Sequence, residues 1–213
     1  MKNHTMHKLW ILILVAVSSA LSAQVRLDKP EMYVGASVGV TESMVMFNPA
    51  ILQDYLMGFN GGFVFRYIAE KNVGMQAELN FSQRGWVEKS GLYSRQLNYI
   101  ELPFMTHIYV GKKNRVFLNF GPKISYLISE KVLTNKTGIT PDLQQITPIQ
   151  HPFDYGGCAG LGLLFNIKGR IIQLDTRVNY SLSNIFDDQK KDYFTNSNNF
   201  NASLNLAWLF QVK

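Results

Sequence analysis

Cysteine is almost absent from this chain of 213 residues, because Cys158 is the only one. A single cysteine cannot form an intramolecular disulfide, so the fold must be stabilised in another way. No spacing of His, Cys, Asp and Glu typical of a metal site occurs, and we expect neither a metal nor a cofactor. Gly156, Gly160 and Gly162 do not lie between a strand and the start of a helix, which excludes a phosphate-binding loop.

Long apolar runs are missing beyond the first residues, so no transmembrane helix is expected in the body of the chain. At the start, Lys2 and Lys8 precede an apolar run at 9–17 and small residues at 18–23. This order predicts a cleavable signal peptide at 1–23, followed by one domain at 24–213. An exported chain without membrane helices can still span a membrane, but only as a closed β-barrel.

Strong charge of one sign is also missing. The chain has 21 Lys and Arg against 15 Asp and Glu, a formal net charge of +6. Loss of Lys2 and Lys8 with the signal peptide would leave +4. No block of like charge stands out, so nucleic acid is not an expected partner.

The chain does show a strict alternation of apolar and polar residues, most clearly in its last stretch, 200–213. One row is wholly apolar and contains Phe200, Ala202, Leu204, Leu206, Trp208, Phe210 and Val212. The opposite row is mostly polar, and the two rows must point to opposite faces of a strand. Globular strands average about five or six residues, whereas a tilted strand that crosses a bilayer needs about nine to eleven. The length of this row therefore favours a lipid-facing strand.

Seven other segments show the same two-residue period, which makes eight predicted strands. These segments are Met32–Val40, Gly58–Tyr67, Val73–Arg84, Leu97–Val110, Arg115–Ile128, Tyr155–Ile167 and Arg170–Ser183. Short connections alternate with long ones, which are expected at Thr41–Met57, Gly85–Gln96, Ser129–Asp154 and Asn184–Asn199. Outer-membrane barrels have short periplasmic turns and long outer loops. The sequence thus predicts an all-β fold, an eight-stranded antiparallel up-and-down transmembrane β-barrel with four long extracellular loops and three short periplasmic turns.

The ionised side chains fall on the mostly polar rows of the predicted strands, and these rows are expected to face the barrel interior. These side chains are Arg66, Glu78, Arg84, Glu101, Lys123, Asp175 and Arg177. A barrel of this size is filled by its own side chains, and buried charges need partners. We therefore assign these charges a structural role, and we expect no catalytic residues among them.

Register arguments place some of these charges opposite one another. Pairing Val110 with Asn114 would put Glu101 opposite Lys123, which predicts a salt bridge between them. Pairing Ile167 with Arg170 would put Asp175 opposite Gly162 and Arg177 opposite Gly160, where the glycines leave room. Pro103 and Pro122 fall within neighbouring predicted strands. They predict a bulge, a missing hydrogen bond or an early strand end.

Aromatic residues of the outward rows fall near the two ends of the strands. Tyr67, Phe165, Trp208 and Phe210 are expected at the periplasmic side, and Phe81, Tyr126, Tyr155, Tyr180 and Phe200 at the outer side. Two such interfacial belts are typical of membrane barrels. Outer-membrane lipid is therefore the expected surroundings of a monomeric barrel.

A lipid-modifying enzyme is an alternative, with His107 or His151 as its base. His107 is expected on the interior row near the periplasmic end, away from lipid, so a packed histidine is favoured over a catalytic one. His151 lies in the third long loop. Cys158 falls among glycines on an interior row and is interpreted as a small packing residue.

Two segments stand out in the predicted strands, Asn98-Tyr-Ile-Glu-Leu-Pro-Phe104 and Asn119-Phe-Gly-Pro-Lys-Ile-Ser-Tyr-Leu-Ile-Ser129. Together with residues 78–85, 179–185 and the Ala23–Gln24 cleavage site, they resemble the PorT-like family of Bacteroidota outer-membrane β-barrel proteins. The resemblance implies an eight-stranded barrel in the outer membrane of a Gram-negative bacterium. The member that gives the family its name is tied to type IX protein secretion, so a secretion or envelope protein is an implied partner.

These observations favour a non-enzymatic barrel that acts through its outer loops or a partner. The strongest loop candidate is Ser129–Asp154, which carries Lys131, Lys136, Asp142 and Phe153. The alternative is a structural or adhesion barrel of the OmpA type that acts alone.

Overall fold

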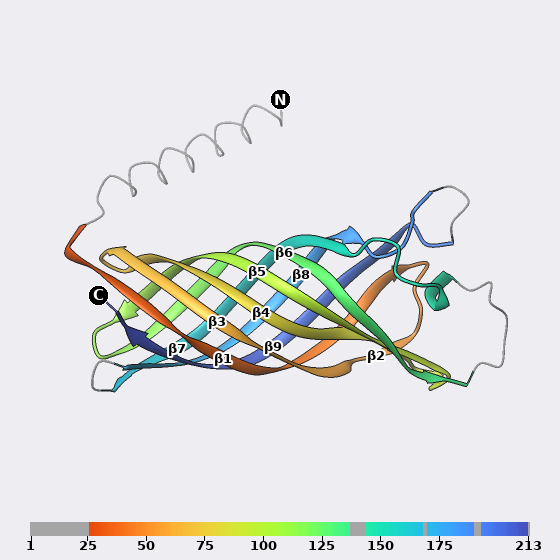
Figure 1. Ribbon diagram of the computed structural model, residues 1–213, viewed down its shortest axis with the longest axis horizontal. Helices are drawn as coiled ribbons and strands as arrows, with labels where there is room; N and C mark the ends of the chain where they lie inside the picture. Colours follow the sequence, from red (N-terminus) through yellow and green to blue (C-terminus); the bar gives the residue numbers. More distant parts are fainter. Residues whose placement is uncertain (1–25, 137–143, 168–169, 190–192, 213) are drawn as a thin grey trace, which may run out of the picture.

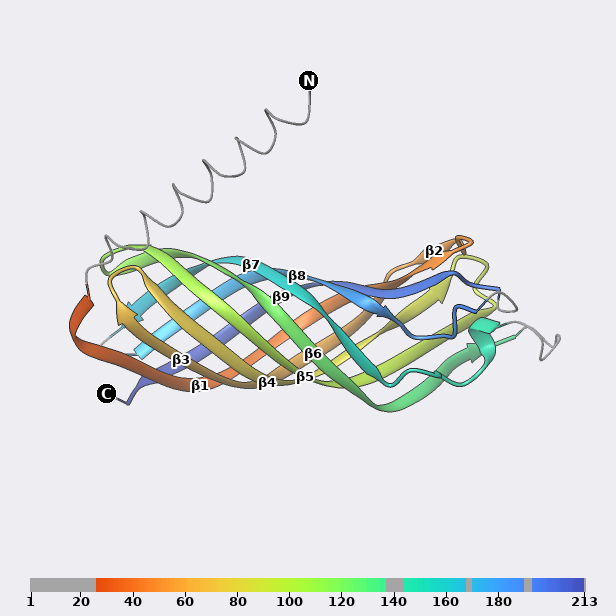
Figure 2. The ribbon, with the colours of Figure 1, turned by 90° about the horizontal axis from the view of Figure 1, so that it is seen from above.

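The computed structural model describes residues 26–136, 144–167, 170–189 and 193–212. In the described part, long tilted strands wrap into a single closed cylinder, seen from two directions in Figure 1 and Figure 2. The same residues include no helix that is long and apolar enough to cross a membrane. The predicted signal peptide at 1–23 lies outside the described residues.

Eight long strands form the wall, and one short strand and a single 3-10 turn lie at one end. The elements are β1 (Arg26–Asn48), β2 (Gln53–Asp54), β3 (Leu56–Glu70), β4 (Val73–Glu88), β5 (Tyr93–Gly111), β6 (Asn114–Asn135), η1 (Gln144–Ile146), β7 (Phe153–Ile167), β8 (Arg170–Asn184) and β9 (Asn196–Gln211). Each of the eight predicted strands corresponds to one of the long strands, and the all-β up-and-down architecture is confirmed.

Sequential long strands pair antiparallel, and the ring closes where β1 meets β9. In that pairing Val34 lies opposite Phe210 and Met46 lies opposite Asn198, so the two strands are joined over nearly their whole length. The short strand β2 pairs with the end of β4, through Gln53 with Glu88 and Asp54 with Val87. Closure leaves the central wall without an unpaired edge, which a barrel needs inside a bilayer.

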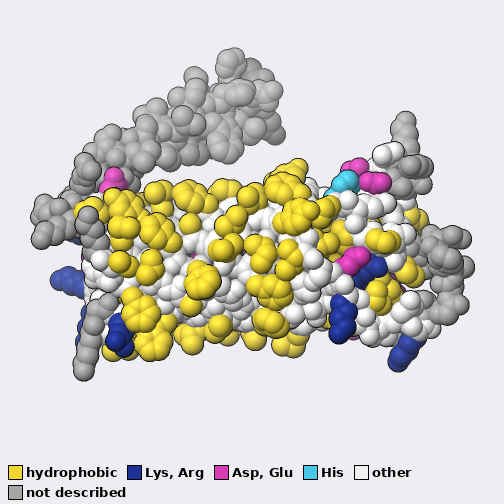
Figure 3. Space-filling model, viewed as in Figure 1, with side chains coloured by type: hydrophobic (Ala, Val, Ile, Leu, Met, Phe, Trp, Pro, Cys, Tyr) yellow, Lys and Arg dark blue, Asp and Glu magenta, His cyan; other side chains and the backbone are white. Residues whose placement is uncertain are grey.

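The two rows of each strand separate as the alternation predicts. On β9, Leu204, Leu206 and Trp208 are exposed, whereas Asn205 and Ala207 between them are buried. Figure 3 shows the result: hydrophobic side chains cover the cylinder wall in a broad band, and charged side chains gather toward its two ends. This arrangement is inverted relative to a soluble barrel, which buries its large apolar side chains.

The connections at one end are shorter than predicted, because the strands continue into them. β1 runs on to Asn48, β4 to Glu88 and β6 to Asn135, so the long predicted loop at Gly85–Gln96 is mostly strand with a tight turn at 89–92. The physical reason lies in the alternation itself. Beyond the apolar band the outward row becomes mixed, with Met46 and Asn48 both exposed, and apolar side chains such as Phe47 and Trp86 point inward. This mixture hides the two-residue period, while the backbone pairing goes on.

The two prolines interrupt one ladder without moving its register. Between β5 and β6, Pro103 pairs with Lys123, and the next pair is Thr106 with Phe120 in the same register. The expected missing hydrogen bonds are therefore found between these two pairs, and the bulge is not.

Candidate functional site

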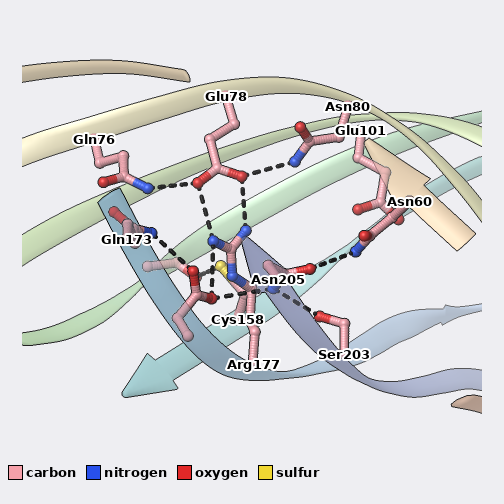
Figure 4. Close-up of polar contacts among 12 residues, drawn as sticks. Asn60, Gln76, Glu78, Asn80, Glu101, Cys158, Gln173, Arg177, Ser203 and Asn205 are labelled. Atoms are coloured by element: carbon pink, nitrogen blue, oxygen red, sulfur yellow. Dashed lines mark hydrogen bonds and ion pairs between the residues drawn. The ribbon is translucent and has the colours of Figure 1, made fainter. Parts of the chain in front are cut away.

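The candidate site is the barrel interior, where the sequence predicts seven charged side chains. All seven predicted side chains point into the lumen and are buried, at most 8% exposed. Figure 4 shows one of the contacts between them: Arg177 extends from β8 across the lumen toward Glu78 on β4. The network therefore joins strands from opposite sides of the ring.

Glu78 and Arg177 form the centre of this network. The Nη1 and Nη2 atoms of Arg177 lie 2.7 and 2.9 Å from the two carboxylate oxygens of Glu78, a bidentate pair. Asn80 Nδ2 donates to the same carboxylate at 2.7 Å, and Arg177 Nη2 lies 3.5 Å from Asp175 Oδ2. Paired charge-assisted hydrogen bonds of this kind are the strong ones in proteins.

A second centre is Arg84, and it corrects one prediction. Its guanidinium forms ion pairs with Glu101 and with Asp154, the latter at 2.8 Å, and its Nη2 donates to Ser125 Oγ at 3.2 Å. The predicted salt bridge between Glu101 and Lys123 is wrong. Glu101 lies opposite Ser125 instead, and among the described residues Lys123 Nζ has no hydrogen-bond partner.

The register error begins at the turn between β5 and β6. Gly111, not Val110, is the last paired residue of β5, and it pairs with Arg115. Gly111 has a φ of 122°, a conformation that side chains rarely adopt and that glycine allows. The turn is thereby displaced by one residue along the chain, and the interior partners on β6 move by two.

Asp154 is the interior charge that sequence reasoning missed. It is the second residue of β7, accepts hydrogen bonds from Ser181 Oγ at 2.9 Å and Ser183 Oγ at 2.6 Å, and is buried. The sequence placed it at the end of a predicted loop, where a charged residue is expected to be exposed to solvent. With Asp154 included, the central lumen holds four cationic and four anionic side chains. These are Arg66, Arg84, Lys123 and Arg177, and Glu78, Glu101, Asp154 and Asp175.

The glycines of β7 leave the space for the charges of β8, in the predicted register. Gly162 lies opposite Asp175, and Gly160 lies opposite Arg177. A Cβ atom on Gly162 would lie 2.7 Å from Asp175 Cβ and 2.7 Å from Phe117 Cε1. Real contacts are longer, so a side chain there must displace its neighbours.

We therefore expect Gly162→Ala to lower the free energy of unfolding by about 1–3 kcal/mol, the usual effect of overpacking. Gly157→Ala on the same strand is the matched control, because its Cβ would meet nothing closer than 3.9 Å. Urea titration of the protein folded in detergent micelles measures both. Equal stability of the two variants would contradict the packing argument.

An apolar cluster closes each end of the lumen. The lower cluster, at the end with the short turns, contains Tyr33, Val64, Ile68, Tyr109, Phe117, Leu164, Ile171, Ala207 and Leu209. The outer cap, at the opposite end, contains Val45, Phe47, Trp86, Tyr93, Leu97, Tyr99, Ile185, Phe186 and Phe194. Going from one end to the other, the lumen is thus filled by apolar, charged and again apolar side chains. The sequence indicated the charged layer but not the cap, because most of its members lie in segments predicted as loops and only Leu97 and Tyr99 lie in a predicted strand.

Hydrogen bonds fix the connections around the outer cap. Gln144 Oε1 accepts from the backbone N atoms of Tyr193 and Phe194 at 3.0 and 2.9 Å. Arg95 donates to the carbonyl oxygens of Ile146 and Thr147. The third long connection is therefore tied to β5 and to the β8–β9 connection, at least over its described residues 144–152.

The two histidines considered as catalytic bases have different surroundings. His107 is fully buried inside the barrel, with Nδ1 2.7 Å from Asn119 Oδ1 and its ring packed against Phe117. It cannot reach the lipid-facing surface. His151 is half-exposed at the outer end, and its Nε2 lies 2.9 Å from Asp187 Oδ1. Across 26–136, 144–167, 170–189 and 193–212, no hydroxyl is hydrogen-bonded to the His151 ring and no metal-binding group of side chains occurs.

The predicted belt residues all lie outside the lumen. Trp208 and Phe210 stack at 5.8 Å between ring centroids near one end, and Tyr126, Tyr155 and Tyr180 are exposed toward the other. Their placement at a membrane boundary remains a prediction.

Several solved protein structures are similar to this chain. The chain is similar to Ail of Yersinia pestis, with 14% identity over 84% of this chain and 99% of Ail, and a TM-score of 0.43. It is also similar to Neisserial surface protein A, with 10% identity over 84% and 98% of the two chains and a TM-score of 0.48. The N-terminal barrel of Pseudomonas aeruginosa OprF matches with 9% identity over 83% and 97%, and a TM-score of 0.37.

Curated protein sequences give no match to this chain. Residues 23–187, which include most of the wall from β1 to β8, match the family described as outer membrane protein beta-barrel domain. The chain belongs to this outer-membrane β-barrel family.

Proposed function

We propose that the protein is a non-enzymatic barrel, closed to diffusion, that acts by binding an envelope protein at its outer end. The family implies the outer membrane of a Gram-negative bacterium as its location. The observation that carries the proposal is the filled lumen. Two apolar clusters enclose a balanced charge network, so the wall serves as a support and the outer end is the surface left for recognition.

The closed lumen has an electrical consequence. Reconstituted into planar bilayers, the protein is expected to give no defined conductance steps, because the outer cap and the lower cluster leave no continuous water path. The measurement is single-channel recording with a general porin as the positive control. Reproducible steps of one size from the purified protein would contradict the closed-barrel proposal.

The outer end carries exposed apolar side chains that the lipid band does not explain. Leu52 is 78% exposed, Tyr55 59% and Tyr193 64%. They belong to neighbouring connections, because Asn48 Nδ2 donates to Thr195 Oγ1 at 2.9 Å and Thr195 N donates to the Asn48 carbonyl at 2.8 Å. Apolar side chains gathered on a polar rim are typical of a protein-binding surface.

Site-specific photo-crosslinking tests this surface in intact cells. A photoreactive residue at Leu52 or at Tyr193 is expected to form one discrete protein adduct. The same residue at Phe104, exposed on the wall, should react with lipid instead. If neither rim position forms a protein adduct, the alternative holds, and the protein is a stand-alone structural or adhesion barrel of the OmpA type.

The resemblance to PorT-like proteins supports a secretion or surface assembly as the class of partner. Mass spectrometry of the adduct identifies it, and the proposal of a type IX secretion role requires a component of that machinery in the adduct. The lipid-modifying alternative has less support, because His107 is enclosed in the barrel. A hydrolysis assay of the unmodified protein with glycerophospholipids decides that point directly.

A further inference from the structure

Two grooves adjoin on the lipid-facing wall at the end with the short turns. Their volumes are about 310 and 600 Å³. The first is lined by Ile167, Arg170, Ile172 and Trp208, and the second by Lys113, Asn114, Phe165, Asn166, Ile167 and Ile172. Ile167 and Ile172 are common to both, so the two grooves form one depression from the start of β6 to the end of β9.

The floor of this depression is apolar and open to the lipid. Trp208 is 51% exposed and Ile167 52% exposed, and Ile172 lies opposite both Phe165 and Trp208 in the strand pairing. An apolar surface at this end of the lipid-facing wall can bind hydrocarbon chains.

Two cations stand at the edge of the depression. Lys113 lies in the turn before β6, and Arg170 is the first residue of β8. The end of β7 lies between them, because Asn166 N donates to the Lys113 carbonyl at 3.3 Å and Ile167 pairs with Arg170. The Arg170 guanidinium lies over the Trp208 ring, 5.9 Å from its centroid. It is thereby held against the apolar wall.

Neither cation forms an ion pair with a carboxylate in the part of the chain that the structure describes. Arg115, at the same end, differs: its Nη1 lies 4.0 Å from Glu31 Oε2. Lys113 and Arg170 therefore leave positive charge at the edge of an apolar groove, where an anionic group with a hydrocarbon tail would satisfy both parts.

We propose that this depression binds an anionic glycerophospholipid, with its phosphate between Lys113 and Arg170 and its acyl chains over the floor. The end of an outer-membrane barrel that carries the short turns faces the periplasm, so the lipid would come from the inner leaflet of the outer membrane. This inference does not rest on the closed lumen or on an outer partner. Its failure and theirs are separate results.

Two other grooves on the described wall lack this combination. The groove beside the β3–β4 turn, about 220 Å³ in volume, has Glu70 on its lining and would repel an anion. The groove of about 520 Å³ near the middle of the wall is lined by Val40, Glu42 and Thr176 among others. Its cationic residue is Arg177, whose guanidinium is bound to Glu78 inside the barrel.

Trp208 provides a direct readout, because it lies in the groove. The protein is reconstituted into vesicles of equal parts phosphatidylglycerol and phosphatidylcholine, with brominated acyl chains on one lipid or the other. Trp86 is fully buried in the outer cap, and Trp10 is replaced by phenylalanine in every sample. Quenching then reports mainly on the lipid beside Trp208. We expect a preference for phosphatidylglycerol of about fivefold for each cation, since one basic residue at a membrane surface contributes about 1 kcal/mol.

The double variant Lys113→Gln/Arg170→Gln is expected to reduce this preference to near unity. Lys71→Gln/Lys89→Gln removes the same charge away from the groove and should leave the preference in place. The single variant Lys113→Gln, with an intermediate preference, keeps the test decisive if the double variant does not fold. Equal quenching by the two lipids in the unmodified protein, or an unchanged preference in the double variant, would overturn the proposal. Displacement of the brominated lipid by excess inorganic phosphate would also overturn it, because the site would then bind a free ion.

Discussion

Replacing Arg84 with methionine is expected to lower the free energy of unfolding of the barrel by about 3–5 kcal/mol or more. Arg84 is the cation that both Glu101 and Asp154 contact, and its side chain is fully buried. Methionine fills much of the same volume but leaves both carboxylates without the cation that contacts them. Removal of one partner from a buried ion pair is strongly destabilising for this reason, and here one removal affects two pairs.

Lys123→Met is the matched control, because it also removes one buried cation. Lys123 is 1% exposed, and its Nζ contacts no acceptor among the described residues. A buried polar group without a partner lowers stability, so its removal should leave the free energy of unfolding unchanged or higher. Urea titrations of both variants in the same micelles compare them. If the two variants lose equal stability, total charge in the lumen matters and the individual contacts do not.

Arg84→Met can be rescued in a way that tests the same contacts. Adding Glu101→Gln and Asp154→Asn removes the two uncompensated charges and keeps their shapes. We expect the triple variant to recover at least half of the lost stability. No recovery would mean that Arg84 acts through packing, for instance through its guanidinium 4.7 Å from the centroid of the Tyr99 ring.

The strands and their two faces could be predicted because the signal is local. In β9 the residues from Phe200 to Leu206 report their own face by their polarity, and no knowledge of neighbouring strands is needed. The same holds for Asp175 and Arg177 opposite the glycines of β7. Their register depends only on the tight turn that joins the two strands.

The pairing of charges between distant strands could not be predicted in this way. Glu101 and Lys123 seemed to be partners because the turn between them was placed one residue too early, and the positive φ of Gly111 is a backbone property. Arg84 and Asp154 are 70 residues apart in the chain. Their meeting depends on the closure of the ring, which lets side chains of β4 and β7 reach each other across the lumen.

The outer cap was missed for a different reason. Its residues come from separated segments, and most of them lie where apolar residues do not alternate over enough positions to predict a strand. Phe47, Trp86 and Phe194 become a cluster only when β1, β4 and the β8–β9 connection are brought together by ring closure. Apolar residues in a long connection are then a sign of packing above the membrane and not of a solvated loop.

Trp86→Ala is expected to open the outer cap while the wall stays folded. Trp86 is fully buried and contacts Phe47 edge to face, with ring centroids 5.6 Å apart, as well as Tyr93 and Phe186. Loss of such a side chain removes about 3–5 kcal/mol from the packing of its surroundings. The wall below has no alternative hydrogen-bond partners in a bilayer, so the loss should appear as local opening of the outer connections.

Protease added to intact cells measures this opening, because cleavage of a transiently open segment follows the population of the open state. A loss of about 3–5 kcal/mol predicts a cleavage rate at the outer connections that rises by about 10²–10³-fold or more. Trp208→Ala is the matched control, since it deletes the same side chain from the lipid-facing wall and should leave this rate unchanged. If both variants are cleaved as slowly as the unmodified protein, the cap does not hold the connections. If both are cleaved faster, the cap and the wall unfold together, and the outer end is not an independent unit. Only an effect confined to Trp86→Ala, together with loss of the Tyr193 adduct, would tie the ordered cap to recognition at the rim.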